Sequence, residues 1–223
     1  NIGKYNLSKD ASDIMNISIL TNAYYPEQNI TKQEFLKFKS DWLIKDAKLE
    51  LIEEYLIKNQ IINLHPELTR YLVDFYLSAS NIKKSCEFFS EVTVPIQDEY
   101  LSKFNLYCLI NYGKNEEAQL ILDLKKELGF QDDYFENKIN YLFGYLDEAD
   151  LEISEKSILE FHLAHRTNPD FSFEPNENTS KLIWKYLSAS NLLYNINDIE
   201  ITDLIKISTI EKAVNDKNYS EKD

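Results

Sequence analysis

The sequence predicts an all-α protein, a tetratricopeptide-like α-solenoid built from antiparallel helix pairs. Apolar residues recur at steps of three and four along most of the chain, which is the period of an amphipathic helix. Only four Gly and five Pro occur among 223 residues, too few for the many tight turns of an all-β fold. The predicted helices also come in pairs, spaced by about 35 to 40 residues, which is typical of helical repeats.

Composition and period divide the chain into three parts. Residues 1–30 show no clear period, and we expect an irregular segment that ends in a turn around Pro26. A single helical-repeat domain is expected over residues 31–216, and a polar tail over residues 217–223.

The first helix of the expected domain is indicated by the sequence TKQE. Its Thr31 and Glu34 form a capping box, in which each side chain bonds the backbone amide of the other. A helix therefore begins at about Lys32, and a second one runs through AKLELIEEYLIKNQ. Pro66 then stands in the first turn of a third helix, where its missing amide is not needed.

The phrase YLSASN occurs twice, at Tyr76–Asn81 and at Tyr186–Asn191. Its small polar residues interrupt the helical period, and Asn81 is of the residue type that caps the amides of a following helix. That helix is expected in IKKSCEFFSEV. The phrase therefore predicts a corner between two helices.

The same pattern of cap, helix and turn continues along the chain. Asp98 caps a helix that Gly113 ends, and NEEAQLILDLKKELG forms its partner. Gly113 and Ala118 flank that turn as small residues, and Ser80 and Ser85 occupy comparable places in the preceding pair. Further helices are expected at about 132–145, 154–165, 180–188 and 202–216.

The stretches FNLYCLINYGKNEEAQLILDLKKELGF, EKSILEFHLAHRTNPDFSFEP and TSKLIWKYLSASNLL carry a family resemblance. From Leu43 to its last residue, the chain resembles an uncharacterised family of alphaproteobacterial helical-repeat proteins. The resemblance implies a tetratricopeptide-like fold, a periplasmic or envelope location and no assigned activity. It also implies that this chain is the N-terminal portion of a longer solenoid and contacts the rest of that parent protein.

The charge of the chain restricts its partners. A formal net charge of −14 repels phosphate backbones, so we expect no nucleic acid partner. No run approaches the roughly 18 apolar residues of a transmembrane helix. We therefore expect a protein or peptide partner.

Two cysteines, Cys86 and Cys108, lie on the inward faces of neighbouring predicted helices. They are either two buried thiols that pack as small hydrophobes or, in the oxidising compartment that the resemblance implies, a disulfide. The spacing leaves both alternatives open.

His162 and His165 in EFHLAHR share one helical face and could bind zinc if Glu155 or Asp170 supplied a third ligand. A metal-dependent hydrolase is therefore the alternative function. The more common role of such histidines is helix packing or a hydrogen bond. His65, just before Pro66, is expected to begin a helix.

Other signs of catalysis are missing from the sequence. Its acidic runs are more typical of a solvated face than of a paired-carboxylate site, and it contains no phosphate-binding glycine loop and no GxSxG motif. We therefore expect a non-enzymatic interaction or scaffold module without a cofactor.

The longest expected loop, RTNPDFSFEPNENT, joins two helices and is a candidate binding segment. We expect at least one of its two phenylalanines to pack beneath the loop, although both could instead face a partner. The candidate protein-binding residues are Arg70, Tyr71, Tyr107, Arg166, Phe171 and Phe173.

Overall fold

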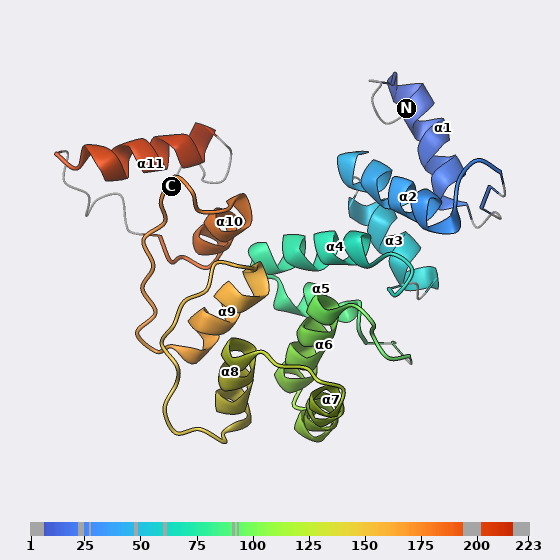
Figure 1. Ribbon diagram of the computed structural model, residues 1–223. Coiled ribbons are helices and arrows are strands. Elements are labelled where there is room, and N and C mark those ends of the chain that lie inside the picture. Colours follow the sequence, from blue (N-terminus) through green and yellow to red (C-terminus); the bar gives the residue numbers. More distant parts are fainter. Residues whose placement is uncertain are drawn as a thin grey trace. The chain divides into compact units, whose positions relative to one another are not determined.

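The computed structural model describes residues 7–21, 25–26, 28–46, 49–59, 62–90, 92, 94–193 and 202–215. These residues form α-helices, turns and loops but no strand, so the all-α prediction is confirmed (Figure 1). The helices are α1 (Lys9–Leu20), α2 (Lys32–Asp46), α3 (Leu49–Asn59), α4 (Pro66–Ser78), α5 (Ile82–Glu87), α6 (Glu99–Asn111), α7 (Asn115–Glu127), α8 (Asp133–Phe143), α9 (Ile158–Thr167), α10 (Lys181–Ala189) and α11 (Leu204–Asn215). None of the helices in the described ranges is long and apolar enough to cross a membrane. The expected polar tail at 217–223 lies outside the described residues.

The chain folds into two compact units. Unit 1 contains residues 1–72 and 88–102, and unit 2 contains residues 73–87 and 103–223. This division differs from the single domain that we expected. Two of its boundaries fall inside α4 and α6, where the apolar period continues and gives no sign of them, and the third lies directly after α5.

Helix α1 occupies part of the segment for which we expected no regular structure. The side chain of Ser8 caps it by accepting a hydrogen bond from the amide of Ala11. Its buried residues are Asn16 and Ile19, whereas Ile14 is 66% exposed. Asn16 accepts a hydrogen bond from the indole of Trp42 at 2.8 Å. A helix that buries a polar residue and exposes an apolar one shows a weak period, which is why the sequence pattern missed it.

The capping box that we predicted at the start of α2 is confirmed. The amide of Thr31 donates to the Glu34 carboxylate at 2.8 Å, and the amide of Glu34 donates to Oγ1 of Thr31 at 3.2 Å. These reciprocal bonds satisfy backbone donors that a helix leaves open at its first turn.

The corners α4–α5 and α6–α7 in unit 2 repeat the same backbone geometry. Ser80 and Gly113, each at the corner, have positive φ angles of 57° and 73°. The next amides, of Asn81 and Lys114, each donate at 2.9 Å to a carbonyl five residues earlier. This is the hydrogen-bond pattern of a Schellman helix end. The predicted cap is also present, because Oδ1 of Asn81 accepts from the amide of Lys84 at 3.1 Å.

The second copy of YLSASN ends α10 one residue later than the first copy ends α4. Its positive φ falls on Asn191, at 55°, rather than on Ser190. The two copies also meet, because the hydroxyls of Ser80 and Ser190 lie 2.8 Å apart. Equivalent residues of the repeated phrase are therefore hydrogen-bonded across 110 positions of sequence.

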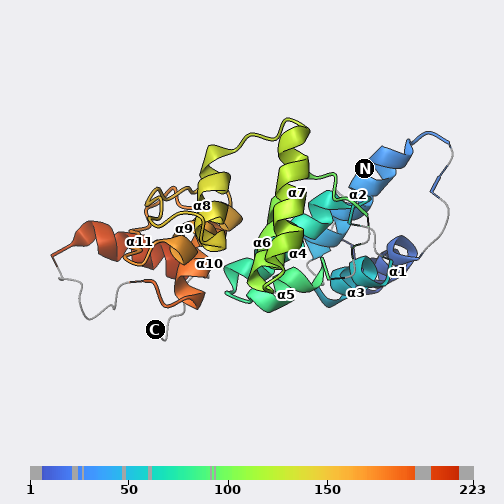
Figure 2. The ribbon, with the colours of Figure 1, turned by 90° about the horizontal axis from the view of Figure 1, so that it is seen from below.

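Helix α9 packs against α8 and α10 within unit 2 (Figure 2). The segment between α8 and α9 is held by Lys138, which is fully buried. Its ammonium donates to the carbonyls of Asp150 and Glu152, the second at 2.9 Å. Helix α9 consequently begins after Ser157, whose side chain caps it, rather than at residue 154 as we expected.

Candidate functional site

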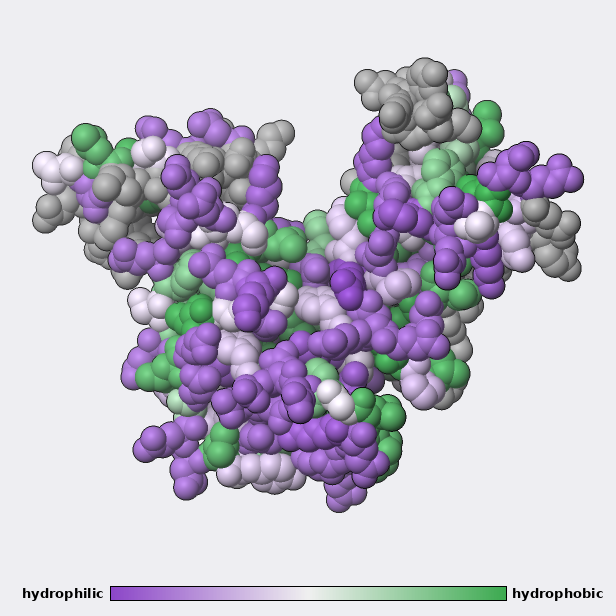
Figure 3. Space-filling model, in the orientation of Figure 1, coloured by the Kyte–Doolittle hydropathy of each residue, from purple (hydrophilic) through white to green (hydrophobic). Residues whose placement is uncertain are grey.

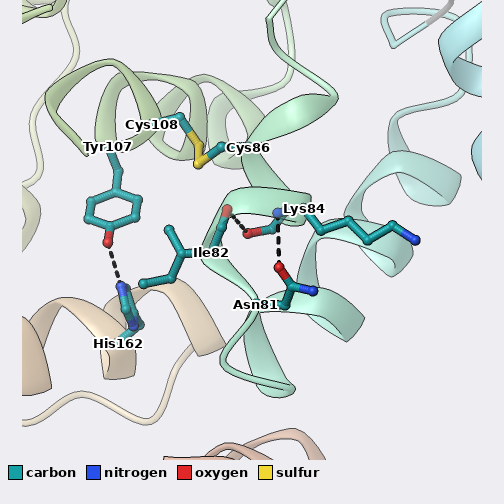
Figure 4. Close-up of a disulfide and its surroundings, with 8 residues drawn as sticks. Asn81, Ile82, Lys84, Cys86, Tyr107, Cys108 and His162 are labelled. Carbon is teal, nitrogen blue, oxygen red and sulfur yellow. Dashed lines mark hydrogen bonds between the residues drawn. A yellow bond between two sulfur atoms is a disulfide. The ribbon is translucent and has the colours of Figure 1, made fainter. Parts of the chain in front are cut away.

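Cys86 on α5 and Cys108 on α6 form a disulfide (Figure 4). Their Cα atoms lie 5.5 Å apart, and both side chains are buried. The bond fixes the short helix α5, of six residues, against α6. The sequence left this pairing open, because helix register alone does not decide whether two inward-facing thiols meet.

Tyr107 precedes Cys108 on α6 and points toward α9 (Figure 4). Its hydroxyl lies 2.6 Å from Nε2 of His162, and only 2% of the residue is exposed. A side chain so buried cannot contact a partner, so our expectation that Tyr107 contributes to a binding surface is wrong. Both neighbours of Tyr107 on α6 are buried as well, which leaves this stretch of the helix without a solvent face.

The hydrogen bonds of Tyr107 belong to a chain of polar groups inside unit 2. Nδ1 of His162 lies 2.7 Å from the Tyr186 hydroxyl, which also lies 2.7 Å from Nδ1 of His165. Burial lowers the pKa of His162 to about 3, and the charges of Arg166 and His165 act in the same direction. The pKa of His165 is lowered by burial and by Arg166. The neutral imidazole of His162 therefore bridges Tyr107 and Tyr186, and His165 contacts only Tyr186 of these two.

The zinc-site alternative depends on these same histidines. Both ring nitrogens of His162 already lie at tyrosine hydroxyls, and Glu155 and Asp170 are exposed. Within the described ranges, no cluster of three or more His, Cys, Asp or Glu side chains could hold a metal ion.

Unit 1 contains a second buried histidine. Nδ1 of His65 lies 3.1 Å from the hydroxyl of Ser40, and Nε2 lies 3.0 Å from that of Tyr55. The Lys39 ammonium sits 4.1 Å above the Tyr55 ring. Burial lowers the pKa of Lys39 to about 8, and burial and Lys39 together lower the pKa of His65 to about 4. His65 also precedes α4, as expected, and its carbonyl accepts from the amide of Thr69.

Arg70 and Tyr71 were expected on a recognition surface. The guanidinium of Arg70 instead binds Asp98 through two hydrogen bonds, Nε to Oδ1 at 3.0 Å and Nη2 to Oδ2 at 2.6 Å. Asp98 in turn caps α6 by accepting from the amide of Leu101. Arg70 therefore fixes the start of a helix, although it remains partly exposed. Tyr71 is half-buried.

The two loop phenylalanines pack on α9. The rings of Phe171 and Phe173 meet the buried ring of Phe161 edge-on, at centroid distances of 5.5 and 4.9 Å. Phe171 also lies 5.0 Å from the ring of His165. Both are half-buried, so they hold the loop against the helix and leave part of each ring accessible.

A surface pocket of about 360 Å³ opens at the end of α9. Arg166, His165 and Phe171 line it, together with Asn168 from the loop. Two of the residues that the sequence singled out for binding, Arg166 and Phe171, are therefore brought together here.

Helix α7 carries an exposed apolar stripe that sequence reasoning missed. Leu120 and Leu124 of α7 and Leu128, its C-cap residue, are 60%, 50% and 89% exposed. The opposite side of the helix is buried at Ala118 and Leu122. We call these three leucines the α7 stripe. The view in Figure 3 is mostly hydrophilic with separate apolar patches. The sequence did contain a sign of this stripe. Its three leucines are spaced four residues apart, separately from Ala118 and Leu122, which pack inward.

Acidic residues follow one edge of the α7 stripe. Glu116, Asp123 and Glu127 recur at steps of seven and four, which places them on one side of the leucines. Among the described residues, neither Glu116 nor Glu127 forms a salt bridge. The two lysines of the last turn of α7 are engaged elsewhere, since Lys126 pairs with Glu136 and Lys125 lies over the ring of Phe130.

Comparison of the chain with protein-family models, with curated proteins and with solved structures found no match. The function is therefore argued from the side chains of this protein.

Proposed function

We propose that the protein is a non-enzymatic helical module that binds a protein partner through the α7 stripe. One observation carries the proposal, namely three leucines in line on a helix whose other side is already packed. Lone exposed leucines are ordinary on protein surfaces, but an aligned row of them is typical of a helix-binding face.

The edge of the stripe defines the chemistry of the partner. Three carboxylates along the leucines, in a chain of net charge −14, attract cations and repel a second copy of the same surface. A partner helix with leucines on one face and lysines or arginines beside them satisfies both features. The proposed partner is therefore a cationic amphipathic helix.

The tetratricopeptide-like arrangement belongs to the same proposal. Helices α4, α6 and α8 begin at Pro66, Glu99 and Asp133, at steps of 33 and 34 residues, close to the roughly 34-residue period of tetratricopeptide repeats. The two equivalent corners of unit 2 support it as well. The Cys86–Cys108 disulfide favours an oxidising compartment such as the periplasm or envelope. A longer parent protein is a further part of the proposal.

A hydrolase that uses His162 and His165 has no comparable support. Both ring nitrogens of His162 are hydrogen-bonded to tyrosine hydroxyls. We therefore do not propose catalysis.

A defined peptide tests the proposal. The probe is a fluorescein-labelled amphipathic helix of leucine and lysine, and its fluorescence anisotropy is followed as the protein is added. The double variant Leu120→Ser, Leu124→Ser should weaken binding by about tenfold or more, which corresponds to about 1.4 kcal/mol. Both leucines are exposed, so the fold should survive the change.

Two controls separate apolar recognition from simple charge attraction. Leu151→Ser removes an equally exposed leucine from a loop and should leave the affinity unchanged. A peptide with glutamate in place of lysine should not bind. If the double variant binds the lysine peptide as well as the unaltered protein does, the attraction is electrostatic alone and the proposed role of the α7 stripe is wrong.

A further inference from the structure

The pocket at the end of α9 combines one cation with aromatic side chains. Arg166 and His165 come from the last turn of α9, Tyr141 comes from α8, and Phe171 and Leu192 close other sides. Its volume of about 360 Å³ is within the range of small-ligand sites, about 300 to 1,000 Å³.

The charge of this pocket is opposite to that of the chain. The sequence contains 38 Asp and Glu against 24 Lys and Arg, yet the described residues that line the pocket include no carboxylate. Arg166 is one of two arginines in the sequence. The other, Arg70, is bound to Asp98. Among the described residues Arg166 forms no salt bridge, and its side chain hydrogen-bonds the neutral hydroxyl of Tyr107.

Hydrogen bonds engage two of the carbonyls near the end of α9. A helix C-terminus normally presents open carbonyls, which repel anions. Here Oγ1 of Thr167 donates to the carbonyl of Leu163 at 2.9 Å, and the amide of Asn168 donates to that of Ala164 at 3.0 Å. The Asn168 side chain is itself oriented by the amide of Asp170, which donates to its Oδ1.

We propose that this pocket binds a carboxylate attached to an aromatic ring, with the carboxylate on Arg166 and the ring against Phe171. An arginine fork matches the two oxygens of a carboxylate. The accessible part of the Phe171 ring, held in place by Phe161 and His165, provides an edge or face for a second ring. This site is independent of the α7 stripe and does not depend on the proposed function.

Two sources supply this chemistry, a free aromatic acid and the C-terminus of a peptide that ends in an aromatic residue. Benzoate represents the first and N-acetylphenylalanine the second. The amide of N-acetylphenylalanine keeps the ring and removes the charge. Binding is measured with the full chain by calorimetry, and the site is located by NMR shift changes at the ring protons of His165 and Phe171.

We expect the acid to bind about tenfold or more tightly than its amide, because a charged bidentate contact is lost. Arg166→Gln should abolish the preference. Lys83→Gln makes the same charge change at an exposed lysine outside the pocket and should keep it. Binding of either acid with shifts at His165 and Phe171 supports the site, and the tighter of the two identifies the source.

Equal affinity for acid and amide, or shifts confined to other residues, would overturn the proposal. The shift measurement uses the unaltered protein, so the result holds even if Arg166→Gln does not fold.

Discussion

Acid should destabilise unit 2 through His162 in a pH range where most carboxylates stay ionised. Burial lowers the pKa of His162 to about 3, whereas an ordinary histidine titrates near 6.5. Below about pH 6.5 the unfolded chain takes up a proton that the folded chain does not, so the free energy of unfolding falls as the pH falls. Each pH unit removes about 1.4 kcal/mol. Between about pH 6.5 and 5 the loss is about 2 kcal/mol from this residue.

Urea unfolding, followed by circular dichroism from about pH 7.5 to 5, measures this loss. His162→Gln should be less stable at neutral pH, because two tyrosine hydroxyls lose a partner, but its stability should depend less on pH. His65→Gln makes the same substitution in unit 1. The pKa of His65 is also lowered, so the stability of this variant should likewise depend less on pH. An NMR titration of the His162 ring protons in the folded protein with a midpoint near 6.5 would refute the reasoning.

Three further outcomes follow from the packing of unit 2. Reducing the Cys86–Cys108 disulfide, which closes a span of 22 residues, should lower the free energy of unfolding by about 3 kcal/mol, measured by urea unfolding with and without reductant. Phe171→Ala and Phe173→Ala should each cost about 2 kcal/mol, less than a fully buried phenylalanine, and an unchanged melting temperature of the double variant would contradict their packing on α9. Lys138→Met removes the donor that holds the segment before α9, so a glutamate-specific protease should cut that segment faster than in the unaltered protein.

Helix ends were predictable because their signals act over a few residues. The capping box at Thr31, the Asn81 cap and the Gly113 turn each depend on atoms within five positions of one another. Such contacts form in nearly the same way whatever the rest of the chain does. Helix α1 lacked a period that would indicate it, since it buries Asn16.

The candidate site was less predictable because it depends on contacts between distant residues. The period of α6 indicates an apolar face, but it does not say that α9 covers Tyr107 with His162, 55 positions away. The apolar stretch around Tyr107 was the available sign, since a helix that is apolar on every side is buried. In the same way, the sequence does not show that Arg166 is exposed in a pocket whereas Arg70 is held in an ion pair.

The repeated phrase YLSASN shows where local signals stop. In the first copy Ser80 takes the left-handed conformation, which is costly for serine, while Asn81 stays free to cap α5. In the second copy Asn191 takes that conformation itself, which asparagine tolerates better. The same six residues therefore permit two backbone turns, one with the left-handed residue at Ser80 and one with it at Asn191. The hydrogen bond between Ser80 and Ser190 adds a tertiary contact to the turn at Ser80, which costs more. Local chemistry decides that a helix ends inside this phrase, at its third or fourth residue, and the packing of unit 2 decides which residue takes the left-handed conformation.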